Sequence, residues 1–355
     1  ELDYVTKKNN IFGVSSYMPF EKLGSLSTLE DRFFSVYANA AYTYDDRYSV
    51  TVSFRTDASN FQAEDVRDKF SPFWSFGASW LISNERFMER ASWIDQLKLR
   101  ASYGIAGVAA GKSGTSSVTT VAVHSGSLIY SGGESFNTIA ERGNNTLTWE
   151  KSRTLNIGVD MAFFGHKLSG SAEFYNKYSY DVLANTTVPV ISQGVESMLL
   201  NNAEIVNRGV EFSIGSDLPV AGDLSWSGVL NYSYNHNELK KFGYSGPYMA
   251  VGNSYVVGRP IGSYSVLKPA GYSPEGYVLL GGKDGSREPI LDEESSHMMD
   301  FVTPREGQTL DDNNWAYYLG AAEPKSTLSF SNMFSWKGLT FSFMLTGQFG
   351  YYVMT

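Results

Sequence analysis

The chain has 355 residues, of which 18% are charged and 15% are aromatic, and it carries a formal net charge of −9. With 34 glycines and no cysteine, the composition excludes a disordered tail, a disulfide-stapled small domain and a metal site built on thiolates. The acidic balance argues against a nucleic-acid-binding protein, and no apolar run approaches the roughly 18 residues of a membrane-spanning helix.

Apolar and polar residues alternate with a period of two, which predicts strands rather than helices. Ten strands are expected in three blocks: four in 31–106, four in 147–236 and a hairpin in 326–350. In the second strand, Val50, Val52 and Phe54 share one face, and Arg55 and Asp57 share the other. The strands run about 9–12 residues, enough for a tilted strand to cross a bilayer, whereas strands of soluble proteins average about 5–6.

The polar face of these strands mixes small and charged side chains, as expected for the wet lumen of a barrel. Aromatic residues gather at strand ends, as they do at membrane interfaces. A soluble sandwich would also alternate, but strand length and the placement of aromatic residues favour a transmembrane β-barrel. The polar residues expected to face the lumen are Arg55, Asp57, Lys98 and Arg100.

The connections between the expected strands alternate between short and long. The short ones are 45–47, 84–94, 165–167, 216–223 and 336–338, and the long ones are 58–71, 107–146, 179–202 and 237–325. This sorting is typical of outer-membrane barrels, whose turns are periplasmic and whose loops are extracellular. We therefore expect extracellular loops at 107–146, 179–202 and 237–325, with 1–30 as the tail of an earlier loop and 351–355 as the start of a later one.

Short motifs follow one another along the chain. They are YTYDDRYSV at 42–50, FRTDASNF at 54–61, FWSFGASW with SNERF at 73–87, IDQLKLRASYG at 94–104, LTWEKS with NIGVD at 147–160, NRGVE at 207–211, GRPIGSY at 258–264, and PK with FSWKG at 324–338. The ordered set resembles the SusC/RagA family of TonB-dependent outer-membrane transporters, which are common in the Bacteroidetes. One position departs from the family pattern, because Ala58 stands where a glycine is usual.

The resemblance implies an all-β fold, a transmembrane antiparallel β-barrel of about 22 strands with a plug domain in its lumen. About ten strands would belong to this chain, and the plug and the last strands would lie outside it. The resemblance further implies import of an oligosaccharide or a peptide across the bacterial outer membrane. A SusD-like surface lipoprotein would cover the loops, outer-membrane lipid would surround the barrel, and TonB would act through the plug. No enzyme activity is implied.

Two other functions stay open from the residues alone. A siderophore or cobalamin receptor of the TonB-dependent type would share these barrel strands, because its selectivity lies in loops. A soluble carbohydrate-binding β protein would also show alternation, but it would purify without detergent, which the apolar outward bands disfavour. An enzyme is not indicated, since no set of nucleophile, base and orienting group stands out. Glycines 77, 104, 158 and 228 are expected to permit bulges or the close approach of a plug.

The long loop at 237–325 is rich in aromatic residues. Aromatic rings suit stacking on sugars and their hydroxyl groups suit hydrogen bonding to them, although the same residues could pack the loop itself or contact a partner. The candidate ligand- or partner-binding residues are Tyr244, Tyr248, Tyr255, Tyr272, Tyr277, Trp315, Tyr317 and Tyr318.

Acidic residues in the same loop, Asp284 and 292–294, raise a calcium site as an alternative to a solvated loop. Their spacing does not fit an EF-hand, because Lys283 and Arg287 occupy positions that should be acidic or neutral. The glycine-rich run 281–286 lacks the spacing of a phosphate-binding loop and is expected to be a turn. The four histidines are far apart in the sequence, so neither a metal site nor a cofactor is expected.

Overall fold

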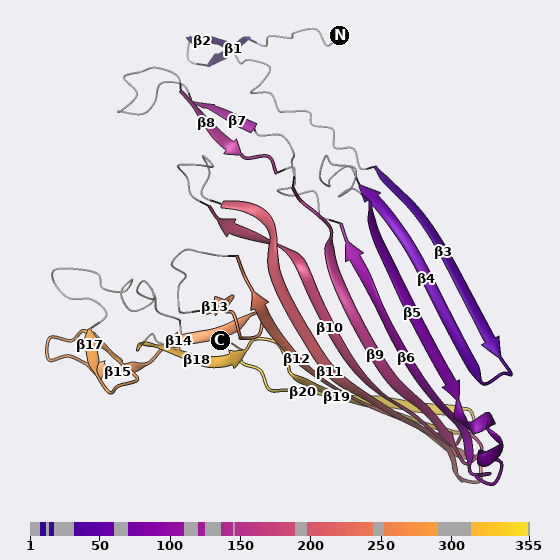
Figure 1. Ribbon diagram of the computed structural model, residues 1–355. Coiled ribbons are helices and arrows are strands. Elements are labelled where there is room, and N and C mark those ends of the chain that lie inside the picture. The colour runs from indigo at the N-terminus through magenta and orange to yellow at the C-terminus, as the bar shows by residue number, and fades with distance from the viewer. Residues whose placement is uncertain are drawn as a thin grey trace.

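The computed structural model describes residues 8–11, 14–17, 32–59, 70–109, 120–124, 136–144, 146–188, 197–243, 252–289 and 314–353. Its main element is a ten-stranded antiparallel sheet, in which each strand pairs with the next sheet strand along the chain (Figure 1). The predicted all-β fold and its ten strands are confirmed. Within the described ranges, no helix is long and apolar enough to span a membrane.

The strands of the main sheet are β3 (Phe33–Tyr44), β4 (Tyr48–Ser59), β5 (Ser71–Leu81), β6 (Ile94–Val108), β9 (Glu150–Phe163), β10 (Leu168–Thr187), β11 (Ser197–Ala221), β12 (Leu224–Lys241), β19 (Ser326–Trp336) and β20 (Leu339–Phe349). Two 3₁₀ helices, η2 (Ile82–Asn84) and η3 (Arg86–Met88), connect β5 to β6. Two hairpins stand apart from the sheet, β1 (Lys8–Ile11) with β2 (Val14–Tyr17), and β7 (Thr120–His124) with β8 (Phe136–Glu141).

The region expected as a loop at 179–202 is mostly strand. β10 runs to Thr187 and β11 begins at Ser197, so the connection is shorter than the alternation predicts. Two register shifts occur between Ser179 and Leu183, and Asp181 has a positive φ of 55° at this irregularity. Because a bulge breaks the period-two pattern, the outer part of the strand is hidden from sequence alternation.

Two further connections differ from expectation. The short turn placed at 216–223 reduces to Gly222 and Asp223, because β11 continues to Ala221 past a register shift at Pro219. Proline suggests a turn in the sequence, yet at an irregular strand end it is tolerated. The segment 237–325 is not one irregular loop. It contains the sheet of β13 (Gly252–Ser254), β14 (Ser263–Leu267) and β18 (Ala316–Ala321), and the sheet of β15 (Pro269–Tyr272), β16 (Val278–Gly281) and β17 (Arg287–Pro289).

The main sheet has one apolar face and one polar face, since alternate residues of each strand point to opposite sides. The apolar face exposes large side chains such as Phe34, Val52, Ile214 and Phe341, which are 47–64% accessible. The polar face carries mainly serine, threonine, asparagine and charged residues. An exposed apolar surface continuous over ten strands is a lipid-contacting surface.

The connections sort to two ends of the sheet (Figure 1). The end with the short turns and the two 3₁₀ helices is called here the short-turn rim. The other end, the long-loop rim, carries the small sheets between β12 and β19. Several of the best-buried side chains, Leu147, Leu239 and Leu280, belong to segments beside this rim. The short and long connections predicted from the sequence are thus found at opposite ends.

Candidate functional site

The polar face holds a chain of ionic contacts across three strands. Arg100 on β6 lies 3.3 Å from Asp160 on β9 and 2.6 Å from Glu173 on β10. Lys98 lies opposite Asp160 in the register of β6 and β9. These carboxylates give the polar face paired charges rather than isolated ones, which lowers the free-energy cost of placing them on a partly buried surface.

Arg55 and Asp57 lie on the polar face, as expected. Arg55 Nε donates to Asp57 at 2.7 Å within β4 itself. Residues two apart on a strand share a face, which permits this contact. Asp57 is 7% exposed, and the Arg55 guanidinium also reaches Ser35 on β3 at 3.4 Å. That this face lines a lumen stays a prediction.

Two glycines of the polar face serve as crossing points for long side chains. A Cβ atom on Gly158 would lie 2.9 Å from Cζ of Arg100, whose guanidinium crosses this position to reach Glu173. A Cβ atom on Gly209 would lie 2.4 Å from the hydroxyl oxygen of Tyr175, which donates to Asn235 two strands away at 3.1 Å. A glycine between two partner strands therefore lets one side chain link three strands.

Glycines 77, 104, 158 and 228 were expected to permit either bulges or the close approach of a plug. The expectation of bulges is wrong, and the approach of a plug stays a prediction. The register of the sheet is continuous at all four positions. Each lies instead close to a neighbouring residue, as Gly77 does to the Thr51 hydroxyl and Gly228 to the Trp226 ring.

The polar face also contains a pocket of about 600 Å³. Its lining comes largely from polar-face residues of β3 to β6 and β9. Arg55 and Asp57 lie along it together with Asn156, Phe73 and Trp149. The two aromatic rings meet edge to face with centroids 5.5 Å apart. Its size and its mixture of aromatic and hydrogen-bonding groups are those of a ligand-sized pocket.

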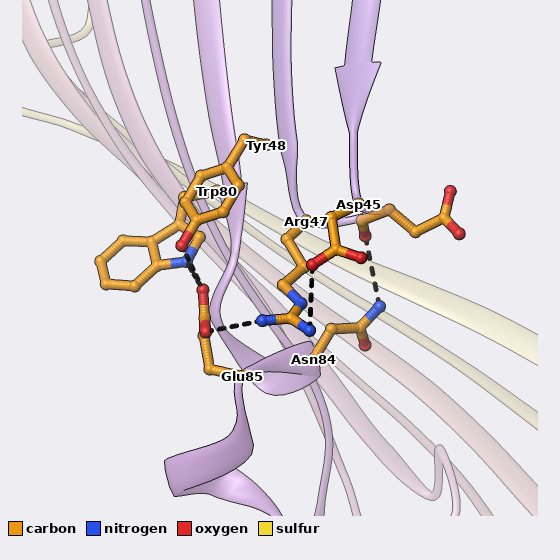
Figure 2. Close-up of polar contacts among 7 residues, drawn as sticks. Asp45, Arg47, Tyr48, Trp80, Asn84 and Glu85 are labelled. Atoms are coloured by element: carbon orange, nitrogen blue, oxygen red, sulfur yellow. Dashed lines mark hydrogen bonds and ion pairs between the residues drawn. The ribbon is translucent and has the colours of Figure 1, made fainter.

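At the short-turn rim, Glu85 is the centre of a polar cluster between η2 and η3 (Figure 2). Its carboxylate accepts from the Tyr48 hydroxyl at 2.5 Å, the Trp80 indole at 2.9 Å and the Arg47 guanidinium at 3.2 Å. Arg47 also pairs with Asp45 at 3.1 Å, and the rings of Tyr48 and Trp80 are stacked. The hydrogen bonds from Tyr48 and Trp80 hold the pKa of Glu85 below its ordinary value of 4.5.

The cluster joins two of the motifs read from the sequence. Tyr48 and Arg47 come from YTYDDRYSV, and Trp80 and Glu85 come from the segment 73–87. Their separation of more than 30 residues hid this contact from the sequence analysis. The Glu85 carboxylate therefore links the hairpin of β3 and β4 to the connection that follows β5.

At the long-loop rim, the sheet β13-β14-β18 is docked on the end of β12. Leu239 exchanges backbone hydrogen bonds with Gly258 and Arg259, and Ile261 N–H donates to the side chain of Asn237 at 2.7 Å. The Tyr352 ring covers Gly320 of β18. These contacts hold the aromatic residues of β18 at a defined place over the rim.

Two candidate aromatic residues, Tyr317 and Tyr318, are neighbours on β18 and therefore point to opposite faces. Each lies next to a cation: Lys268 Nζ is 5.9 Å from the Tyr317 ring centroid, and Arg259 Cζ is 4.3 Å from that of Tyr318. Such cation–π contacts stabilise the loop sheets themselves. These two tyrosines do not form one binding platform.

The other candidates are dispersed. Tyr255 contacts Phe242, Tyr272 is 75% exposed at the end of β15, Tyr277 lies half-buried in the following turn, and Trp315 precedes β18. Tyr244 and Tyr248 lie outside the described residues. A binding role for this set stays a proposal.

Residues 282–286 form a turn, as predicted, after Gly281 ends β16. The Asp284 carboxylate accepts from the Ser286 backbone N–H at 2.9 Å, from its hydroxyl at 2.6 Å, and from the Asn314 amide at 2.9 Å. The Ser286 donors, followed by Asn314, lower the pKa of Asp284 to about 2. Residues 292–294 of the calcium alternative lie outside the described residues. Across the described ranges, no group of three or more metal-ligating side chains is assembled.

Comparison with known proteins gives consistent similarities. The family model for "TonB dependent receptor-like, beta-barrel" matches residues 1–287. The chain is 27% identical over 346 residues to TonB-dependent receptor P39 of Formosa agariphila, covering 89% of the chain and 32% of that protein. It is 24% identical over 324 residues to TonB-dependent receptor SusC of Bacteroides thetaiotaomicron, covering 90% of the chain and 31% of that protein.

Among solved structures, the chain is similar to the RagAB peptide importer in its closed-closed state. The TM-score is 0.70 at 24% identity, with 90% of this chain and 33% of that one covered. This likeness is one of fold. The chain spans about a third of the length of the relatives that it matches.

The two glycine crossings predict different mutational costs. Gly158→Ala displaces only the mobile end of Arg100, so we expect a loss of about 1 kcal/mol, similar to that of Arg100→Ala. Gly209→Ala meets the Tyr234 backbone oxygen at 2.4 Å, so we expect about 3 kcal/mol. Denaturant unfolding of the detergent-solubilised full-length protein measures both. If the losses in unfolding free energy caused by Gly158→Ala and Arg100→Ala added fully in the double variant, the crossing contact would be contradicted. Both changes are expected to remove the same ion pair.

Replacing Glu85 tests the short-turn cluster. Glu85→Gln should lower the Tm by several degrees, because the neutral amide no longer attracts Arg47 and its donors compete with Tyr48 and Trp80. Glu89→Gln, an identical charge change directly after η3, is the matched control and should leave the Tm unchanged. Equal Tm values for the two variants would show that the cluster does not stabilise the rim.

The Asp284 turn predicts a pH effect confined to the loop sheet. Because the folded pKa is depressed, the ionised carboxylate stabilises the turn above about pH 4, and this contribution is lost as the pH falls toward about 2. Asp284→Asn should mimic the acid state at neutral pH and speed hydrogen exchange at the Ser286 amide, with Glu275→Gln on the preceding turn as control. Unchanged exchange in Asp284→Asn would refute the role of the carboxylate.

Proposed function

Because the chain belongs to the family of TonB dependent receptor-like β-barrels, we propose that it forms part of the wall of a transporter that imports an oligosaccharide or a peptide. The family is non-enzymatic and its barrels lie in the bacterial outer membrane. The ten strands are a portion of such a barrel, and the resemblance to SusC and RagA relatives seen in the motifs is confirmed.

The observation that carries the proposal is the two-sided sheet. Its apolar face exposes Phe34, Phe76 and Phe341, among others, to the surroundings. Its polar face carries a wall of paired charges and a ligand-sized hollow. An apolar exterior with a polar interior is the arrangement by which outer-membrane barrels enclose a polar solute path.

A SusD-like surface lipoprotein and TonB are the partners we propose for the full-length protein. The docked loop sheets at the long-loop rim support this, because Tyr272 and Tyr318 are exposed there. Arg259 lies over the Tyr318 ring, and Lys268 lies over the neighbouring Tyr317 ring. Such surfaces suit contact with a lid protein or with a passing sugar or peptide.

Fractionation and uptake by cells test the proposal. We expect the full-length protein in the outer-membrane fraction with a co-purifying lipoprotein, and we expect a deletion strain to lose uptake of one labelled oligosaccharide or peptide class. Complementation with the intact gene is the control. Normal uptake together with poor growth under iron or cobalamin limitation would instead assign a siderophore or cobalamin receptor. Recovery from the soluble fraction without detergent would indicate a soluble carbohydrate-binding protein.

A further inference from the structure

Charged side chains interrupt the apolar face near the long-loop end of β9 and in the middle of β11. Arg153 on β9 pairs in register with Ile105 of β6 and Tyr178 of β10, which places it on the apolar face. Arg208 on β11 pairs with Asn176 and His236, on the same face. Both arginines are exposed.

Arg153 lies at the height of a membrane boundary. It is ten residues before Phe163, which stacks with Trp93 at the short-turn rim. With a rise of about 3.4 Å per residue and a tilt of about 40°, this separation corresponds to about 25 Å along the barrel axis. An outward apolar band has about that height, so Arg153 stands where hydrocarbon gives way to headgroups.

Tyrosines surround this position. The Arg153 guanidinium lies 4.6 Å from the ring centroid of Tyr180, and Tyr180 stacks on Tyr178 with centroids 5.8 Å apart. Stacked tyrosines at this height are typical of the interfacial belt. The Arg153 guanidinium is exposed, and its planar fork of N–H donors can bind two oxygens of one phosphate group at once.

The charged residues around Arg153 and Arg208 carry a net positive charge, although the chain as a whole carries −9. Three carboxylates, Asp181, Glu204 and Glu238, each pair with a lysine: Lys151, Lys241 and Lys240, at 3.4, 3.7 and 2.5 Å. In the described part of the chain, neither Arg153 nor Arg208 lies within 4.0 Å of a carboxylate. The two arginines therefore supply the surplus positive charge.

We propose that Arg153 and Arg208 bind phosphate groups of a phosphorylated glycolipid in the outer leaflet. The guanidinium fork matches phosphate oxygens in pairs, and the tyrosine rings contact the adjoining sugar and acyl region. The assignment to the outer leaflet rests on the proposed function, because it places the long-loop rim outside. Charge complementarity selects this occupant over a neutral lipid.

Lipid binding by the full-length protein tests the proposal. The protein is purified from outer membranes in detergent and titrated with diphosphoryl lipid A or with enzymatically dephosphorylated lipid A, and bound lipid is measured by native mass spectrometry. We expect Arg153→Gln and Arg208→Gln each to weaken binding of the phosphorylated lipid about fivefold, and together about 25-fold. Arg153→Lys with Arg208→Lys should restore part of the loss.

Lys337→Gln is the matched control. Lys337 also lies over an aromatic ring, that of Trp336, but at the short-turn rim; its replacement should leave lipid A binding unchanged. Equal binding of the dephosphorylated lipid, or equal binding by the double glutamine variant with unchanged Tm, would overturn the inference while leaving transport untouched. Loss of binding to an acidic protein partner, but not to lipid, would also overturn it. Recovery outside the outer membrane would refute the proposed function itself.

Discussion

Backbone pairing between neighbouring strands is the constraint on which the rest of this structure depends. In hydrocarbon, every N–H and C=O group needs a partner within the protein, and a sheet provides it only while its strands stay in register. Here the ladder runs from β3 to β20. Its shifts lie near strand ends at Ile94 and Pro219, and within the long strands β10 and β11 at Ser179 and Glu204. A slip by one residue would exchange the lipid-facing and polar faces, so register alone decides which side chains meet lipid.

Long polar side chains reinforce that register. The Arg100 contact with Glu173 and the Tyr175 contact with Asn235 each pass over a glycine of the intervening strand. A slip of any of the three strands would break such a contact and leave a charge or hydroxyl unpartnered on the wall. This gives a physical meaning to glycines within strands, which otherwise weaken a sheet by lacking a side chain.

The fold was largely predictable from the sequence, because period-two alternation reports directly on which face each residue occupies. The contacts of the site were not. Glu85 meets Tyr48 across 37 positions, and the crossing at Gly158 depends on a residue of another strand. Alternation of polar and apolar residues also fails to predict a strand where its backbone is irregular, as at Asp181. In the loop sheets, tyrosines that are adjacent in the sequence do not form one binding surface, because Tyr317 and Tyr318 point to opposite faces of β18.

The two rims differ in chemistry as well as in loop length, and this difference bears on orientation. At the short-turn rim a carboxylate, Glu85, is held by aromatic donors and an arginine. Toward the long-loop rim the apolar face carries Arg153 beside Tyr180, with the nearby Asp181 and Glu204 already paired to lysines. With the long-loop rim outside, as the proposed function places it, Arg153 and Tyr180 would meet the outer membrane boundary and the Glu85 cluster would lie toward the periplasm. The chemical difference between the two rims therefore belongs to the strands and their short turns, and does not depend on the long loops.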